Sequence, residues 1–334
     1  MKSPNASTLA QLADLANVSV ATVSRSLAGN PVIAEATRSR IVALAKEHGF
    51  QVNQAARNLR LKRTGAIGVV LPLGHEADQN LSDPFFMSLL GPLADAIASR
   101  GHDLLLSRVI PRDNRWLDRI VDSGRVDGIV VIGQSNQIEA IERVAQRYRP
   151  MVVWGAEQPG KAQITVGSDN VAGGRIAAEH LLAQGRRRLA FFGNVEVPEF
   201  ALRFAGFSQA LTAAGQGAGT LLPLHLTSQS SYGAIEEFLG KNPSPDGIVA
   251  ASDVIAMSAL RALAAHGKRV PQEVAVVGYD DVLIATHTTP PLTTIRQDVA
   301  RGADVMIDLL FRRMEGDEVA PMSMTPQLIL RSSA

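Results

Sequence analysis

The chain contains no cysteine, so disulfide bonds and thiolate-bound metal sites are excluded. Its longest apolar runs are about eight residues, too short to span a bilayer. The first residues, Met-Lys-Ser-Pro-Asn-Ala-Ser-Thr, lack the apolar core of a signal peptide, and we expect a cytoplasmic protein. With 46% apolar and 19% charged residues in 334, the composition is that of a well-packed soluble protein with two or three folding units.

No constellation of residues typical of an enzyme stands out. The seven histidines are scattered along the chain without metal-ligand spacing. The run Gly215-Gln-Gly-Ala-Gly219 follows no clear strand and lacks the spacing of a phosphate-binding fingerprint, so we interpret it as a loop. We therefore expect a binding protein without cofactor or metal, not an enzyme.

Charge is unevenly distributed along the chain. Residues 1–63 carry nine Lys and Arg and three acidic residues, a net charge of +6. The remaining residues carry a net charge of −5, so the overall value of +1 conceals a basic head on a mildly acidic body. A basic head is what contacts with nucleic-acid phosphates require.

The head also has the pattern of a helix-turn-helix. Thr8 and Gln11 stand at the positions of a capping box, and apolar residues then recur at helical spacing up to Ala16. Ser19 is placed to cap a second helix, and a third is predicted over about residues 34–48. An ordinary three-helix bundle would share this pattern. The excess of positive charge favours a DNA-binding unit, whose second helix lies in the major groove.

From Gly65 onward, short apolar runs alternate with amphipathic stretches. Continuous apolar strands between helices indicate parallel sheets that are covered on both faces. The number of strands favours two sheets, with a ligand cleft at the carboxyl ends of their strands. The predicted strands are 66–71, 102–107, 128–132, 151–154, 189–192, 247–251 and 274–277, and the predicted helices are 87–99, 117–123, 138–148, 172–184, 201–214, 232–239 and 255–266.

Taken together, these segments resemble the lactose/galactose-repressor family of bacterial transcription regulators. Residues 18–27 resemble the family's recognition-helix signature, and residues 49–59 are similar to its hinge-helix segment. The resemblance runs from about residue 8 to about residue 331, with the landmarks in the family's order. The landmarks of its effector domain are similar to residues 166–174, 203–207, 277–281 and 290–297.

The resemblance implies an α/β chain: an all-α helix-turn-helix head followed by a periplasmic-binding-protein type I body of two parallel-sheet subdomains. It also implies a homodimer, because a palindromic operator needs two heads. The expected head covers residues 1–63, with a hinge helix at about 53–60, and the expected body covers residues 64–334. Within the body, subdomain 1 is expected at about 64–164 and 296–323, and subdomain 2 at about 166–293 and 326–334. The chain is expected to cross between the subdomains near residues 164–167, 293–296 and 323–326.

The expected DNA contacts fall in two groups. In the second helix, hydroxyls are expected to contact phosphates and small apolar side chains a thymine methyl, while Arg25 makes a two-pronged contact with guanine. In the hinge, the resemblance implies a helix that forms only on operator DNA and whose Leu59 wedges into the minor groove. The predicted DNA-binding residues are Thr8, Ser19, Val20, Ala21, Thr22, Ser24, Arg25, Asn53, Ala56 and Leu59.

The effector site is predicted around Asp280 and Arg203. The Asp280 carboxylate can accept hydrogen bonds from neighbouring hydroxyls of a sugar, and the Arg203 guanidinium offers a fixed fork of donors. Phenylalanines after Asp83-Pro84 supply an apolar platform, and Trp154 fits the cleft and the core equally well. With matches to the family's cleft motifs, the predicted effector-binding residues are Phe85, Phe86, Arg203, Tyr232, Ser252, Asp280 and Gln297.

The sequence thus favours a repressor of carbohydrate-utilisation genes that a small sugar releases from its operator. A regulator that uses a purine-like co-repressor stays open, because nothing in the sequence specifies the ligand. A solute-binding protein would share the body, but the basic head argues against it. A sugar-modifying enzyme would need a nucleophile–base or nucleotide motif that the sequence does not show.

Overall fold

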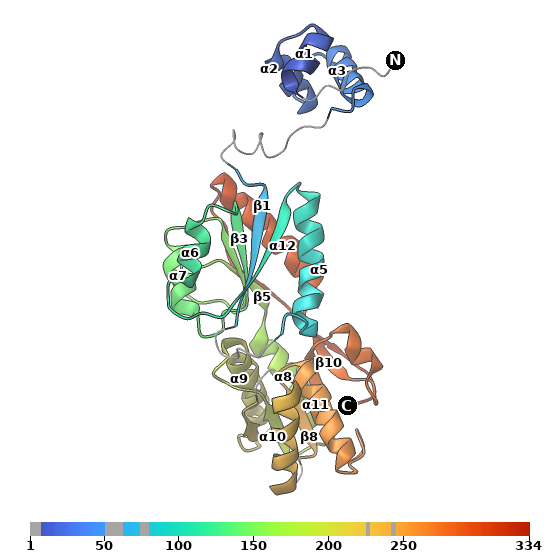
Figure 1. Ribbon diagram of the computed structural model, residues 1–334. Coiled ribbons are helices and arrows are strands. Elements are labelled where there is room, and N and C mark those ends of the chain that lie inside the picture. The colour runs from blue at the N-terminus through green and yellow to red at the C-terminus, as the bar shows by residue number, and fades with distance from the viewer. Residues whose placement is uncertain (1–7, 51–62, 74–79, 225–227, 242–244) are drawn as a thin grey trace. The chain divides into compact units, whose positions relative to one another are not determined.

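The computed structural model describes residues 8–50, 63–73, 80–224, 228–241 and 245–334 (Figure 1). The chain divides into two compact units, residues 1–64 and 65–334. The first unit is built of helices and the second of two α/β lobes.

Three helices form the first unit: α1 (Leu9–Ala16), α2 (Val20–Leu27) and α3 (Glu35–Glu47). Thr8 and Gln11 close the predicted capping box at the start of α1, and Asn17 ends this helix in the left-handed conformation, with φ 49°. The Ser19 side chain caps α2. The core of the unit consists of Leu12, Ala13, Ala16, Val23, Ile41 and Ala45.

The second unit contains two six-stranded sheets. The first is parallel throughout, in the order β11-β5-β4-β3-β1-β2. Its strands are β1 (Ala66–Pro72), β2 (Asp103–Val109), β3 (Gly128–Ile132), β4 (Met151–Trp154), β5 (Thr165–Ser168) and β11 (Met322–Met324). Side chains of α5 (Pro84–Ser99) and α12 (Val299–Glu315) pack on one face, and those of α6 (Trp116–Asp122) and α7 (Ile138–Ala145) on the other.

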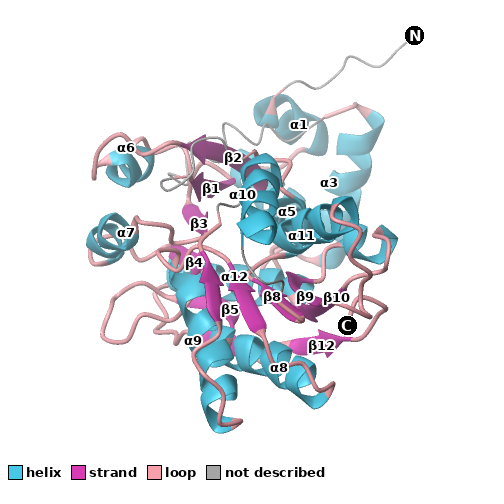
Figure 2. Cartoon of the chain, turned by 90° about the horizontal axis from the view of Figure 1, so that it is seen from below, coloured by secondary structure: helices cyan, strands magenta, loops and turns pink. Residues whose placement is uncertain are grey.

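The second sheet has the order β12-β10-β9-β8-β6-β7 and is parallel except for β12, which runs antiparallel to β10. Helices again enclose the strands (Figure 2). The elements are β6 (Leu189–Phe192), β7 (Thr220–Leu222), β8 (Gly247–Ala250), β9 (Ala275–Asp280), β10 (Thr293–Arg296), β12 (Gln327–Ile329), α8 (Asn170–Ala183), α9 (Pro198–Ala213), α10 (Ser228–Lys241), α11 (Asp253–Ala265) and the 3₁₀ helix η1 (Leu283–His287).

Strand β1 shows why the apolar runs are unbroken. Ile67, Val69 and Leu71 belong to the core beneath α5 and α12, whereas Val70 belongs to the core beneath α6 and α7. Since successive side chains of a strand point to opposite faces, a sheet covered on both faces needs apolar residues at every position. The predicted fold class is confirmed.

We call the first sheet with its helices lobe 1, and the second lobe 2. The chain crosses between them after β5, between β10 and α12, and between β11 and β12. The second crossing lies later than predicted, because residues 293–296 still form strand β10 of lobe 2, which pairs with β9. The first crossing also lies later, because residues 165–168 still form a strand of lobe 1 that pairs with β4. Gly167 permits this pairing, since a Cβ there would overlap the carbonyl oxygen of Gly155.

Helices α8 and α9 approach each other at glycines. A Cβ on Gly174 would overlap the carbonyl oxygen of Arg203, and one on Gly206 would overlap that of Val171. A Cβ on Gly173 would collide with the Tyr279 ring. The missing side chains let the two helices pack backbone against backbone, and this close packing fixes the position of Arg203 beside β9. Within the described ranges, no helix has both the length and the apolar character needed to cross a membrane.

We predict that Gly206→Ala lowers the free energy of unfolding by about 1–3 kcal/mol, because the added methyl group overpacks the α8–α9 contact. Gly233→Ala is the matched control. A Cβ at Gly233 of α10 meets open space, so this change should stabilise the helix by about 0.5–1 kcal/mol. Denaturant unfolding of the three proteins measures the difference, and equal effects of the two substitutions would contradict the packing argument.

Candidate effector and DNA-binding sites

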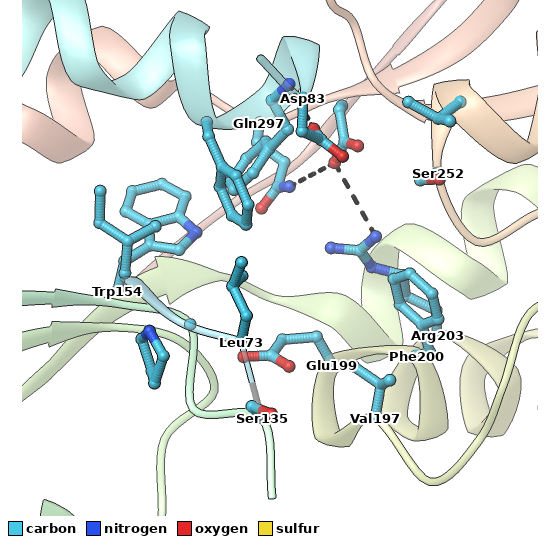
Figure 3. Close-up of a pocket in the computed structure, with 17 residues that line it drawn as sticks. Leu73, Asp83, Ser135, Trp154, Val197, Glu199, Phe200, Arg203, Ser252 and Gln297 are labelled. Carbon is cyan, nitrogen blue, oxygen red and sulfur yellow. Dashed lines mark hydrogen bonds and ion pairs between the residues drawn. The ribbon is translucent and has the colours of Figure 1, made fainter. Parts of the chain in front are cut away.

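A cavity lies between the two lobes, where strands of both sheets end (Figure 3). This is where ligands bind in open α/β sheets. Lobe 1 contributes Pro72, Leu73, Asp83, Phe85, Phe86, Ile132, Gly133, Ser135 and Trp154. Lobe 2 contributes Val197, Glu199, Phe200, Arg203, Ser252, Val254 and Asp280, and Gln297 comes from the crossover between β10 and α12.

Arg203 of α9 is held on several sides. Its Nε donates a 2.8 Å hydrogen bond to Oδ1 of Asn170, and Nη1 donates to the carbonyl oxygen of Ala251. The guanidinium carbon lies 3.6 Å from the centre of the Tyr279 ring, a cation–π contact. Nη1 also lies 3.8 Å from Oδ1 of Asp280. These contacts fix the orientation of a side chain that is only 5% exposed.

Asp280 is the last residue of β9 and has a φ of +117°, an unusual value for a residue with a side chain. Its Oδ1 accepts a 2.7 Å hydrogen bond from Nε2 of Gln297. Burial raises the pKa of the Asp280 carboxyl to about 7, although Arg203 and Gln297 oppose the shift. Such a carboxyl changes its charge near neutral pH and responds strongly to hydrogen-bond donors that enter the cavity.

Two neighbouring acids connect this site to β10. Asp253 accepts hydrogen bonds from the Thr294 hydroxyl at 2.6 Å and from the backbone N–H of Val282 at 2.9 Å. Burial and the nearby Asp280 raise the pKa of Asp253 well above its usual range. Asp281 forms ion pairs with Arg296 and with Arg331. Both acids therefore hold β10, the strand that leads into the second crossover.

The apolar wall of the cavity is aromatic. The Phe85 ring centre lies 6.1 Å from that of Phe86 and 6.1 Å from that of Trp154. Trp154 is 4% exposed and belongs both to the core of lobe 1 and to the cavity lining. Asp83 caps α5 by accepting a 2.9 Å hydrogen bond from the backbone N–H of Phe85, and this cap positions the two phenylalanines.

The structure brings together six of the seven predicted effector-binding residues. Ser252 lines the cavity and caps α11, accepting a 3.3 Å hydrogen bond from the backbone N–H of Ile255. Tyr232 is not part of the lining. Its hydroxyl donates a 2.6 Å hydrogen bond to Glu236, and the Arg261 guanidinium of α11 lies over its ring. Tyr232 thus takes part in packing between α10 and α11.

Sequence reasoning missed Glu199, the second residue of α9, which lines the cavity. The available signal was its spacing from Arg203, since residues four apart share one face of a helix. Burial raises the pKa of the Glu199 carboxyl, while Arg203 and the backbone of Gln134 and Ala156 oppose the shift. Among the described residues, no group of three or more His, Asp or Glu side chains is placed to hold a metal ion.

In the first unit, Ser19, Val20, Ala21 and Arg25 are exposed along α2, whereas Thr22 and Ser24 are half-buried. Two of the predicted DNA-binding residues also serve as caps: the Thr8 side chain accepts from the backbone N–H of Gln11, and the Ser19 side chain from that of Thr22. The hinge predictions, Asn53, Ala56 and Leu59, lie outside the described residues.

The raised pKa of Asp280 predicts a pH-dependent stability. In the unfolded chain the carboxyl ionises near 3.8 and in the folded chain near 7, so folding becomes less favourable as the pH rises between these values. Asp280→Asn removes this titration. Between pH 4.5 and 7.5, the free energy of unfolding of the parent should fall relative to that of the variant, by at most about 4 kcal/mol. The midpoint temperature of the parent should fall with it, relative to that of the variant. A difference that stays constant over this range would contradict the assignment.

Two segments match described protein families. Residues 8–53 match "Bacterial regulatory proteins, lacI family", and residues 178–334 match "Periplasmic binding protein-like domain". The two segments fall in the first and second units, respectively.

Known proteins are similar over almost the whole length. The HTH-type transcriptional regulator CelR of Thermobifida fusca is 32% identical, over 98% of this chain and 98% of CelR. The HTH-type transcriptional repressor PurR of Erwinia tasmaniensis is 30% identical, over 98% of this chain and 96% of PurR. A solved complex of the transcriptional regulator CelR with cellobiose is 29% identical, covers 98% of this chain and 100% of that one, and superposes with a TM-score of 0.72.

These likenesses extend over the head and both lobes at once. They confirm the resemblance inferred from the sequence: the chain belongs to the lacI family of bacterial regulatory proteins.

Proposed function

We propose that this chain represses carbohydrate-utilisation genes by binding a palindromic operator as a homodimer, and that a small sugar releases it. The observation that carries the proposal is the pairing, in one cavity, of an aromatic wall from lobe 1 with Asp280 and Arg203 from lobe 2. An aromatic face suits the apolar side of a sugar ring, and charged groups suit its hydroxyls. The likeness to CelR, of which a complex with cellobiose is known, supports a sugar. We infer that the protein acts in the cytoplasm by binding, without catalysis.

A purine-like co-repressor is the second candidate. The likeness to PurR favours it, and the rings of Phe85, Phe86 and Trp154 can also stack against a base. A thermal-shift screen over sugars and nucleobases separates the candidates, because a ligand that binds the folded state raises its midpoint temperature.

An exposed apolar surface of the second unit is a candidate for the interface of the homodimer. Leu283 and Ile284 of η1 are 80% and 50% exposed, and Met87 of the contacting helix α5 is 50% exposed. Large apolar side chains gathered on a surface are typical of an interface. We propose that a second copy of the chain covers them.

We assign DNA recognition to the head predicted from the sequence, residues 1–63, whose expected hinge helix at about residues 53–60 lies outside the described residues. The exposed face of α2, with Val20, Ala21 and Arg25, is proposed to enter the major groove. Arg25 stands in the last turn of α2 and is the side chain of this face that can make a two-pronged contact with guanine.

We predict that Arg25→Ala weakens specific operator binding by about 1–3 kcal/mol, because a two-pronged arginine–guanine contact is lost. Binding to non-specific DNA should weaken much less. Arg40→Ala is the matched control: it removes the same charge from an exposed position of α3. Gel-shift titrations at fixed salt, with operator and with random DNA, measure both affinities. If Arg25→Ala lowers both by one factor, Arg25 contacts a phosphate and does not read a base.

The release step tests the cavity. A sugar should lower the operator affinity of the parent, whereas Asp280→Asn should bind the operator normally and no longer respond, because the variant lacks the anionic acceptor. Calorimetry for the sugar and a gel-shift titration for the operator measure the two properties separately. If the variant binds the sugar and leaves the operator as the parent does, Asp280 is structural and the effector site lies elsewhere.

A further inference from the structure

The cavity carries more acid than base. Asp83, Glu199 and Asp280 line it, and Arg203 is the single basic side chain among the described residues of its lining (Figure 3). The positive charge of Arg203 is already shared, because its guanidinium donates to Asn170 and to the carbonyl oxygen of Ala251 and faces Asp280. An anionic ligand would therefore meet three carboxyl groups and one engaged guanidinium.

The three acids differ in their partners. Asp83 accepts a hydrogen bond from the backbone of Phe85, and Asp280 accepts one from Gln297. The Glu199 carboxyl interacts with the backbone N–H groups of Gln134 and Ala156, but its Oε1 atom is shielded from solvent and has no hydrogen-bond partner. A buried acceptor without a donor raises the free energy of the folded protein. A ligand that donates a hydrogen bond to this atom removes that penalty, and the gain contributes to its affinity.

Glu199 also stands where the lobes meet. It belongs to α9 of lobe 2, while Gln134 and Ala156, whose backbone groups act on its carboxyl, follow β3 and β4 of lobe 1. Figure 3 shows its side chain extending towards Leu73 and Ser135, both of lobe 1. A ligand that donates to Glu199 is therefore held at the boundary between the lobes.

We propose that Glu199 is the specificity-determining acceptor of the cavity: it receives a hydrogen bond from a hydroxyl of an uncharged saccharide and, with Asp83 and Asp280, bars saccharides that carry a phosphate or a carboxylate. The proposal rests on the proposed function, since it takes a sugar as the effector. Hydrogen bonds to a charged acceptor contribute about 1.5–3 kcal/mol, which corresponds to roughly a 10- to 100-fold change in affinity.

The experiment compares the parent, Glu199→Gln and the control Glu179→Gln in the full-length chain. Glu179 lies on α8, pairs with Arg175 and is half exposed, so its substitution leaves the cavity intact. Titration calorimetry uses glucose, cellobiose and maltose as neutral probes and glucuronate and glucose 6-phosphate as anionic probes. The monodeoxy analogues of the neutral sugar that binds best are then titrated against all three proteins, and midpoint temperatures verify that each is folded.

The parent and the control should bind a neutral sugar and discriminate against both anionic probes. Glu199→Gln should lose about 10- to 100-fold in affinity for the full sugar but little for one monodeoxy analogue, the one that lacks the hydroxyl read by Glu199. A merely structural role would lower the affinity for every analogue by one factor.

Two results would overturn the inference while leaving the proposed function standing: a uniform loss, or no loss, across the analogues, and tight binding of the anionic probes to the parent. If none of the sugars binds the parent while a nucleobase does, the proposed function falls and this inference falls with it.

Discussion

The guanidinium of Arg203 links the packing of lobe 2 to the chemistry of the cavity. It joins Asn170 at the start of α8, the carbonyl oxygen of Ala251 after β8, and the Tyr279 ring of β9. The side chain starts from α9, whose approach to α8 depends on Gly174 and Gly206. A buried cation is tolerable only when its donors and its charge are met, and here they are met by backbone, amide and ring. The interactions that bury Arg203 also aim it at Asp280.

The backbone at the end of β9 connects the cavity with a crossover. Asp280 and Asp281 have φ values of +117° and +57°, and neither is a glycine. Such conformations persist where surrounding contacts hold them, and they occur at functional sites. Asp280 turns towards Arg203 and Gln297, whereas Asp281 turns towards Arg296 of β10 and Arg331. A ligand that changes the environment of Asp280 therefore acts one residue from the ion pairs that anchor β10.

The sequence predicted most of the elements that have strong periodicity. The three helices of the first unit and the apolar strands of both sheets follow the expected ranges closely, because a strand buried on two faces cannot be polar. Helix α12 and the strands β5, β7, β10, β11 and β12 were not predicted. The missed strands have only three or four residues, and so short a strand has no distinct pattern. The end of β5 depends on Gly167 fitting against Gly155, a contact between distant segments that no local pattern reports.

The same limit applies to the cavity. Arg203 and Asp280 could be found because they stand in recognisable motifs, and both line the same cavity in the structure. Glu199 was missed because a glutamate in the first turn of a helix is common: its negative charge interacts favourably with the helix dipole, so it suggests no further role. The burial of its Oε1 atom without a hydrogen-bond partner became visible only in the structure, where residues of lobe 1 lie beside it. Tyr232 shows the converse, since a motif position can be satisfied by packing against Arg261.

The placement of side chains on two lobes explains how a ligand can act as a switch. A ligand shifts a conformational equilibrium only to the extent that it binds one conformation more tightly. Phe85, Phe86 and Trp154 come from lobe 1, and Arg203 and Asp280 from lobe 2, so both sets touch a ligand together only when the lobes are close. An open cleft would offer half of these contacts. The closed form therefore binds the ligand more tightly than the open form by the contribution of the contacts that the second lobe adds. Coupling is reciprocal: an interaction that holds the lobes in one arrangement changes the affinity for the ligand by the same factor by which the ligand changes the strength of that interaction.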